Sequence, residues 1–409
     1  MVNSQDIGDG FAARRVEFRV SRALHERYRR STIRGGELLL TLVGANFGRV
    51  AIAPKHYEGF NCARPVAVVP LTVDPQFAMF ALQSPLSRHY MDNWANTTAQ
   101  PTLNLKDVAN LPIPLPPSEE QLAIAQNLRV LDDKMELNRK MNETLEAIAQ
   151  AIFKSWFVHF DPVRAKARGE PPESICRRLG LTPDILALFP DRLVDSELGE
   201  IPEGWEPRTV GGVADVIKGK SYKSSELGPS KTALVTLKSF SRGGGYRLDG
   251  LKEYTGSFRG EQEVFAGELI VAYTDVTQAA DVIGKPALIV SDSRYEHLVI
   301  SLDVAVIRPK RPEDRWFLYG MMSNDAFQQY TRAHTTGTTV LHLAAGAVPN
   351  FRFSWPNKGL VEAYAELTQP IFELIDCRVG ESGRLGSIRD VLLPKLLSGE
   401  LRVALETAA

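Results

Sequence analysis

Residues 34–41 read Arg-Gly-Gly-Glu-Leu-Leu-Leu-Thr, and residues 266–272 read Ala-Gly-Glu-Leu-Ile-Val-Ala. Each stretch is a short apolar run that follows a glycine, which is typical of a buried β-strand. The match continues, because Gly48-Arg-Val-Ala-Ile52 returns as Gly284-Lys-Pro-Ala-Leu288. A repeat at this separation is too long for a solenoid unit. It predicts one folding unit present twice, which suits a target that itself has two halves, such as duplex DNA.

The two copies stay aligned over most of the chain. Residues 97–103 match residues 335–341, and from Pro116 and Pro356 onward the offset holds at 240 (356 − 116). Val2 aligns with Val235, so the residues just before position 235 have no counterpart in the first copy. We therefore expect a first module that is incomplete at its N-terminus, or a natural start that lies further upstream.

Composition limits the class of protein. The chain has 409 residues, a formal net charge of −1 and three cysteines, none in a CxxC pair. This length allows two to four domains. The cysteines argue against a disulfide framework or structural zinc and fit a reducing cytoplasm. No signal peptide or run of 18 apolar residues is present, so we expect no membrane span. Any nucleic-acid site must be a local basic patch.

Two long helices are predicted, one after each β-rich module. Ser118-Glu-Glu-Gln121 has the pattern of a capping box. About 40 residues without Gly or Pro follow, with apolar residues at spacings of three and four. We expect a coiled coil whose seam contains polar residues; a plain amphipathic helix on a domain core is the alternative. In the second helix, Pro370 and Pro394 should cause kinks, and Gly399 should end it. The predicted seam residues are Leu128, Leu131, Met135, Asn138, Asn142, Leu145, Ile152, Ile388 and Leu392.

Catalytic chemistry is not indicated. Gly219-Lys220-Ser221 resembles the end of a phosphate loop, but Ala214 stands where that pattern needs glycine. The seven histidines are scattered, without metal-ligand spacing. We therefore expect a binding protein that is not an enzyme, with no catalytic residue, metal or bound cofactor.

Two basic stretches stand out from the neutral whole. Residues 14–34 hold eight arginines against two glutamates, and residues 218–252 hold eight Lys or Arg against two acids. Such side chains neutralise phosphates and read guanine, amides read adenine, and hydroxyls bind bases or phosphates. Solvated surface charge and ordinary turn chemistry are the alternatives. The predicted DNA-binding residues are Gln5, Arg14, Arg15, Arg19, Asn46, Arg49, Thr98, Gln100, Lys218, Lys220, Lys238, Ser239, Arg242, Lys285, Thr336 and Thr338.

Four motifs resemble the specificity (S) subunit of type I restriction–modification systems. Leu115-Pro-Pro-Ser-Glu-Glu-Gln-Leu-Ala-Ile-Ala125 is similar to the entry of that family's central conserved helix, and residues 152–163, Ile-Phe-Lys-Ser-Trp-Phe-Val-His-Phe-Asp-Pro-Val, to its exit. Leu198-Gly-Glu-Ile-Pro-Glu-Gly-Trp205 resembles the start of a second target-recognition domain. Leu392-Leu-Pro-Lys-Leu-Leu-Ser-Gly-Glu-Leu401 resembles the distal conserved helix. Their order and spacing cover nearly the whole chain.

The resemblance implies an α+β fold: two mixed β-rich target-recognition domains separated by two long antiparallel helices in a coiled coil, with an internal pseudo-two-fold repeat. The expected parts are a first recognition domain (1–117), central helix (118–158), linker (159–204), second recognition domain (205–356), distal helix (357–401) and tail (402–409).

The resemblance also implies a function in the cytoplasm. Each domain would read half of a bipartite site in double-stranded DNA, with the helices as a ruler. The chain would recruit two modification (methyltransferase) subunits, which use S-adenosylmethionine, and restriction subunits, which use ATP and Mg. The alternatives are a non-catalytic adaptor that binds protein and dimerises through its coiled coil, and an inactive, truncated S subunit.

Overall fold

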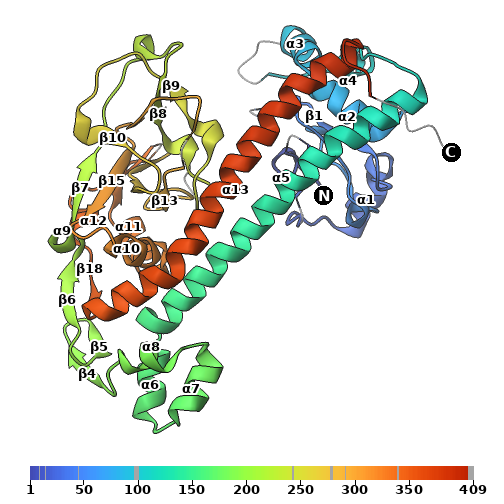
Figure 1. Ribbon diagram of the computed structural model, residues 1–409. Helices are drawn as coiled ribbons and strands as arrows, with labels where there is room; N and C mark the ends of the chain where they lie inside the picture. The colour runs from blue at the N-terminus through green and yellow to red at the C-terminus, as the bar shows by residue number, and fades with distance from the viewer. Residues whose placement is uncertain are drawn as a thin grey trace. The chain divides into compact units, whose positions relative to one another are not determined.

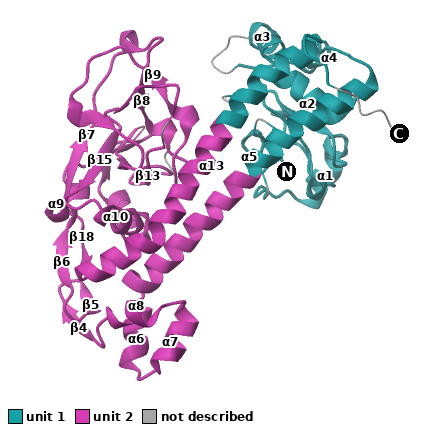
Figure 2. Cartoon of the chain, viewed as in Figure 1, with its two compact units in different colours: residues 1–136, 384–409 teal, residues 137–383 magenta. Residues whose placement is uncertain are grey.

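The computed structural model describes residues 1–8, 10–13, 15–44, 46–95, 101–241, 244–276, 280–290, 292–338 and 340–403. The chain forms two compact units, Met1–Glu136 with Arg384–Ala409, and Leu137–Gly383 (Figure 2). Two long helices, α5 (Ser118–Phe153) and α13 (Lys358–Ser398), each have residues in both units. The expected α+β class is confirmed (Figure 1).

The first unit is built on a three-stranded antiparallel sheet of order β2-β1-β3. Strand β1 (Leu38–Thr41) lies between β2 (Val50–Ile52) and β3 (Val66–Val69), and β1 and β2 coincide with the two apolar runs at residues 34–41 and 48–52. All four β1 side chains are buried, as expected for a central strand covered on both faces. The unit also contains η1 (Ser4–Asp6), α1 (Arg22–Arg27), η2 (Arg29–Ser31), η3 (Lys55–Tyr57), α2 (Pro75–Gln83), α3 (Pro85–Trp94) and α4 (Leu105–Ala109).

The second unit repeats this sheet. Strand β11 (Leu269–Ala272) pairs antiparallel with β13 (Pro286–Leu288) and with β15 (Val304–Pro309), as β1 does with β2 and β3. A fourth strand, β7 (Ala214–Lys218), extends the sheet to the order β13-β11-β15-β7. Helices α10 (Asp314–Ser323) and α11 (Asp325–Ala333) then follow β15 as α2 and α3 follow β3. The repeat read from the sequence is therefore confirmed in the order and pairing of its strands.

A second sheet in this unit has the order β10-β14-β8-β9. Its centre is a parallel pair, β8 (Thr232–Val235) and β14 (His297–Ile300). Strands β9 (Lys252–Glu253) and β10 (Glu263–Val264) lie at its edges. In the first unit, Val2 forms the corresponding parallel bridge with Cys62. The unit's other elements are β6 (Glu206–Thr209), α9 (Val210–Val213), η5 (Ser224–Glu226), η6 (Leu237–Ser239), η7 (Leu248–Gly250), η8 (Gly260–Gln262), β12 (Thr274–Asp275), β16 (Thr335–Thr336), β17 (Leu341–Leu343), α12 (Ala347–Asn350) and β18 (Arg352–Trp355).

Residues 159–204 are packed into the second unit's main core. Helix α5 is followed by a π-helical turn, η4 (Lys154–Val158). In residues 159–204, Pro and Gly divide the chain into short elements: α6 (Asp161–Ala167), α7 (Pro172–Leu179), α8 (Pro183–Ala187) and the hairpin β4 (Leu193–Ser196)–β5 (Gly199–Pro202). Ile175, Phe189 and Ile201 from this segment are buried in the same cluster as Trp156. The predicted linker is thus a folded segment with its own apolar contacts.

Helices α5 and α13 pair antiparallel within each unit. In the first unit Asp132 binds Arg389 at 3.0 Å, and Met135 faces Gly386. In the second unit Asn138 donates to Glu381 at 2.8 Å, while the Tyr364 hydroxyl lies 3.3 Å from the Ala149 carbonyl oxygen. In both units, contacts made by later residues of α5 fall on earlier residues of α13. The two helices therefore run antiparallel.

The ends of the two helices differ in part from the predictions. The Gln121 side chain donates to the Pro116 carbonyl at 2.8 Å, so it does not close the expected capping box. Helix α13 is continuous through Pro370 and Pro394, and its own residues Leu360 and Phe372 are buried in the core of the second unit, where Phe372 stacks on Trp316. The predicted stop at Gly399 is confirmed by its φ of +74°.

The predicted seam residues lie mostly between the helices or against the modules. Leu128 and Asn138 are buried, and the Asn138 amide also donates to the Ser382 hydroxyl at 3.2 Å. Ile388 differs, since 48% of it is exposed while Leu393 and Leu396 carry the buried face of α13 in the first unit. The other predicted positions are half-buried: Leu131, Met135, Asn142, Leu145, Ile152 and Leu392.

Gly219 is explained by packing rather than by phosphate binding. A Cβ added there would lie 2.1 Å from the Ser301 carbonyl oxygen and 2.3 Å from that of Ile300. We expect Gly219→Ala to destabilise the second unit by about 2 kcal/mol, because backbone atoms must move. Urea unfolding of the full chain measures this. Gly260→Ala is the control, since nothing lies within 4 Å of its added Cβ; equal midpoints for both variants would contradict the prediction.

Glu146 on α5 makes the second unit's stability depend on pH. Burial, followed by the nearby Glu143 carboxylate, raises the pKa of Glu146 to about 7. Because this folded-state pKa lies above the unfolded value, stability is full below about pH 4.5 and falls as pH rises toward 7. We expect Glu146→Gln to gain about 2 kcal/mol over wild type at pH 8 and little at pH 5. Urea midpoints at the two pH values test this, and an equal gain at both would refute it.

No described helix is long and apolar enough to cross a membrane. The described residues also include no group of three His, Cys, Asp or Glu side chains that could hold a metal ion.

Candidate nucleic-acid interface

The first unit exposes a run of arginines on α1 and η2. Helix α1 begins after Ser21, whose hydroxyl accepts the Leu24 N–H at 3.3 Å, and ends at Tyr28. Two hollows open here, and Arg29 and Arg30 line both of them. Arg27, Tyr28 and Ser31 complete the first hollow, and His25, Thr32 and Arg34 complete the second.

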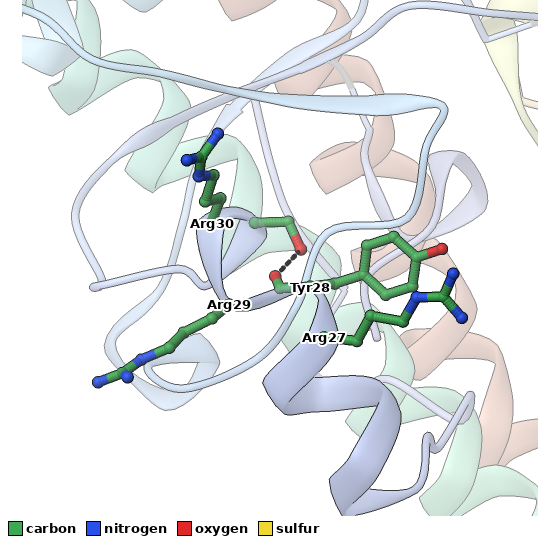
Figure 3. Close-up of a pocket in the computed structure, with 5 residues that line it drawn as sticks. Arg27, Tyr28, Arg29 and Arg30 are labelled. Atoms are coloured by element: carbon green, nitrogen blue, oxygen red, sulfur yellow. Dashed lines mark hydrogen bonds between the residues drawn. The ribbon is translucent and has the colours of Figure 1, made fainter.

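The guanidinium groups fan outward rather than converging on one point. In Figure 3, Arg29 and Arg30 extend in different directions, and Arg27 lies beside the Tyr28 ring. The Arg27 guanidinium carbon is 5.9 Å from the centre of that ring. This arrangement does not form a cage for one small anion. It suits an extended anion, such as a nucleic-acid backbone with successive phosphates.

This cationic surface has no carboxylate partner in the described part of the chain. Arg27, Arg29, Arg30 and Arg34 form no ion pair among those residues, whereas surface arginines of the second unit commonly do, as in Arg178–Glu170 at 2.7 Å. Unpaired like charges repel one another, so a bound polyanion would relieve that repulsion. The cluster is therefore the strongest candidate phosphate-contacting surface in this unit.

Asn61 positions the arginine run. This buried side chain donates through its amide nitrogen to the Tyr28 carbonyl at 3.1 Å, and its Oδ1 accepts from His25 Nδ1 at 2.7 Å. Its own carbonyl accepts the Val2 N–H at 2.8 Å. Asn61 therefore holds both the C-terminal end of α1 and Val2, which lies just before the η1 turn.

In the second unit, several predicted residues gather where strands of the four-stranded sheet end. This edge of the sheet is formed by the C-terminal ends of β7 and β11. Strands β7 and β11 both run antiparallel to β15, so they run parallel to each other and end at the same edge. Lys218 ends β7, and Tyr273 directly follows β11. The Lys218 ammonium lies 4.7 Å from the centre of the Tyr273 ring. Lys285, just before β13, lies at the same edge because β13 is antiparallel to β11.

The Thr-rich segment forms a hairpin attached to this edge. Strand β16 pairs with β17, and β17 pairs with β12, which follows β11. Leu343 N–H donates to the Tyr273 carbonyl at 2.8 Å, so the hairpin is bonded beside Lys218. Thr336 and Thr338 are exposed on the hairpin. The equivalent residues that were predicted in the first copy, Thr98 and Gln100, lie outside the described residues.

A pair of cations lies at the base of this hairpin. Burial first, and then the nearby Arg332 charge, lower the pKa of Lys285. The Arg332 carbonyl accepts the Thr335 hydroxyl at 2.8 Å, which links α11 to the hairpin. An anion bound here would favour the charged lysine. Arg332 and Tyr273 were not singled out from the sequence, because only the paired strands bring them to this edge.

A short connection joins the two sheets of this unit. Lys220 N–H donates to the Ile300 carbonyl at 2.9 Å, and Ser301 N–H donates to the Val235 carbonyl at 3.0 Å. The Lys220 ammonium donates to the Ser257 carbonyl and is half-buried. Lys238, on η6 just after β8, is exposed. The ends of both sheets therefore contribute cations near the turn at Ser301.

The remaining predicted residues fall into three groups. Arg15 and Arg19 are exposed, as is Gln5 in the middle of η1. Asn46 and Arg49 are half-buried in the loop between β1 and β2. Ser239 is fully buried, because its hydroxyl accepts the Thr236 N–H at 3.2 Å, so its side chain holds the turn and does not face a ligand. Arg14 and Arg242 lie outside the described residues.

The chain is similar to several known proteins. Residues 20–147 match the family model described as "Type I restriction modification DNA specificity domain". The chain is 25% identical to the type I restriction enzyme HindI specificity subunit of Haemophilus influenzae, over 91% of this chain and 88% of that one. It is 26% identical to the MjaIX specificity subunit of Methanocaldococcus jannaschii, over 90% and 78%.

A crystal structure of the S subunit of a type I restriction–modification system from M. genitalium aligns with a TM-score of 0.48 and 18% identity, over 89% of this chain and 83% of that one. The family model and the two near full-length relatives point to the same group of proteins as the four motifs. Over most of its length, the chain is similar to the specificity subunits of type I restriction–modification systems.

Proposed function

We propose that this chain is the DNA sequence-specificity subunit of a type I restriction–modification complex. Each β-rich module binds one half of a bipartite site in double-stranded DNA, and the chain itself catalyses no reaction. One observation carries the proposal: the same strand order occurs twice, and each copy exposes cations at its surface. A duplex presents two half-sites to such a repeated reader.

The chemistry of modification and cleavage then belongs to partner subunits. We infer that two modification subunits, which use S-adenosylmethionine, and restriction subunits, which use ATP and Mg, assemble on this chain in the cytoplasm. The chain would hold none of these cofactors and would instead determine which duplex the partners meet. The α5–α13 pair would set the distance between the two half-sites.

Selection from a pool of random duplexes tests this function. The full chain is co-expressed with the modification subunit of its own system, and the purified complex is incubated with the pool at moderate salt. We expect enrichment of two specified blocks with an unspecified spacer, and methyl transfer from S-adenosylmethionine to adenine in enriched duplexes. A complex that binds every duplex equally, or binds none, would refute the proposal; a protein-binding adaptor would give that result.

Insertions in the helix pair test the ruler separately. Seven residues, about 10 Å of helix, are added after Met135 in α5 and before Gly386 in α13, because these positions face each other. We expect the unspecified spacer to lengthen by about three base pairs, with both half-sites unchanged. An unchanged spacer would refute the ruler and leave sequence reading intact.

A further inference from the structure

Two short 3₁₀ turns occupy equivalent places in the two units. Turn η1 (Ser4–Asp6) follows the parallel bridge of Val2 with Cys62, and turn η6 (Leu237–Ser239) follows the parallel pairing of Val235 with Ile300. Each turn is followed by an antiparallel bridge, Ile7 with Ala12 and Phe240 with Tyr246. Each turn therefore begins at the equivalent position in its own copy of the repeated fold.

Their backbone hydrogen bonds also correspond one to one. Ala63 N–H donates to the Val2 carbonyl at 2.7 Å, as Ser301 N–H donates to the Val235 carbonyl at 3.0 Å. After the turn, Ala13 N–H donates to the Asp6 carbonyl at 2.8 Å. In the second unit, Arg247 N–H donates to the Ser239 carbonyl at 2.9 Å. Each turn is thus fixed on both sides by the same contacts.

The residue that caps each turn and the third residue of the turn use their side chains internally. The Asp6 carboxylate accepts the Asn3 N–H at 2.7 Å, and the Ser239 hydroxyl accepts the Thr236 N–H at 3.2 Å. Asn3 and Thr236 in turn cap the turns at their starts. Asp6 and Ser239 are buried as a result. Two different sequences therefore build the same reciprocal cap.

The middle residue is where the two turns differ in exposed chemistry. Gln5 and Lys238 are both exposed, and neither side chain makes a hydrogen bond or ion pair within the described residues. The backbone of Lys238 is closely packed, because a Cβ added to Gly250 would lie 2.1 Å from the Lys238 carbonyl carbon. A hydrogen-bonded turn that presents one exposed polar side chain has the form expected of a preorganised reader.

We propose that Gln5 and Lys238 are equivalent base-reading positions, one for each half-site. Gln5 reads adenine, because its amide can accept from adenine N6 and donate to N7. Lys238 reads guanine, because its ammonium donates to O6 and N7. This inference rests on the proposed function and assigns specificity to a single position within it. Surface lysine and glutamine that only contact phosphate would bind every sequence alike.

Polar groups close to Gln5 and Lys238 are suited to binding the DNA phosphate backbone while these two residues contact base edges. In the first unit the Asn46 amide lies 3.5 Å from the Ser4 carbonyl, which places the β1–β2 loop with Arg49 beside η1. In the second unit Lys220 N–H donates to the Ile300 carbonyl at the end of β14, and Ile300 pairs with Val235 just before η6. Phosphate contacts of this kind fix the register in which a reader meets a base edge.

Exchange of the two residues tests the proposal. Gln5→Lys and Lys238→Gln are made singly in the full chain with its modification subunit, and enriched duplexes are sequenced. In Gln5→Lys, one position of one half-site should shift from adenine to guanine by about tenfold or more. Lys238→Gln should shift one position of the other half-site from guanine to adenine. Gln126→Lys and Lys231→Gln make the same changes at exposed positions outside the turns and should leave the motif unchanged.

The outcomes separate this inference from the proposed function. A motif that is unchanged in both exchange variants, or a uniform loss of binding to all duplexes, would overturn base reading by these turns while the wild-type motif upheld the function. A shift that also occurs in the two control variants would overturn it as well. Absence of any bipartite motif with wild type would refute the proposed function and this inference together. Equal thermal unfolding of each variant and wild type verifies folding.

Discussion

Replacement of Arg27, Arg29 and Arg30 together by glutamine is expected to weaken DNA binding about 100-fold at low salt. The three guanidinium groups fan outward around the end of α1 and have no carboxylate partner in the described chain, so no internal ion pair is lost. Each phosphate contact adds roughly one unit to the slope of log K against log salt. The slope should therefore fall by up to about three, and the loss should be the same for every DNA sequence. Fluorescence anisotropy at salt concentrations from about 50 to 200 mM measures both quantities.

A matched variant separates position from net charge. Arg178, Arg192 and Arg208 are surface arginines of the second unit that pair with Glu170, Glu203 and Glu206. Their triple replacement by glutamine removes the same charge, and we expect affinity to fall less than about threefold. An equal loss in both triple variants would show that only net charge matters. An unchanged salt slope in the Arg27–Arg30 variant would remove these residues from the interface.

Trp156→Ala should lower the free energy of unfolding of the second unit by about 4 kcal/mol. Trp156 is 2% exposed and lies in the π-helical turn η4 that ends α5. Its ring centre is 5.4 Å from Phe189 and 6.1 Å from Tyr364, so it joins the 159–204 segment to α13. Removal leaves a cavity that three elements cannot all close. Chemical unfolding followed by far-UV circular dichroism should show the second unit melting at lower denaturant.

Two comparisons make this test specific. Trp156→Phe keeps most of the apolar volume, and we expect less than half of the loss. Limited proteolysis of Trp156→Ala should cut residues 161–189 early, because Phe189 loses its aromatic partner. Unfolding curves of Trp156→Ala and wild type that coincide would contradict the packing role. The transition of the first unit serves as an internal reference, since its core is a separate cluster.

The sequence predicted those strands and helices whose formation depends on residues that are close together in the chain. Short apolar runs that follow glycine became β1, β2 and β11, and the long run without Gly or Pro became α5. The capping box and the kinks in α13 were not found, since tertiary contacts outweighed local preferences at Gln121 and Pro370. Residues 159–204 read as a linker because Pro and Gly mark breaks in a helix, but burial of Ile175 and Phe189 shows no such local signal.

The candidate interface was only partly predictable. The sequence by itself determined that there are two similar modules, where their strands and long helices run, and which segments are basic, because these depend on neighbouring residues along the chain. Tertiary structure alone decided that Ser239 faces inward while Gln5 and Lys238 face outward from matching turns. It also brought Lys218, Tyr273 and the Thr-rich hairpin to one sheet edge. Strand pairing joins residues far apart in the chain, and no local pattern encodes which pairs will meet.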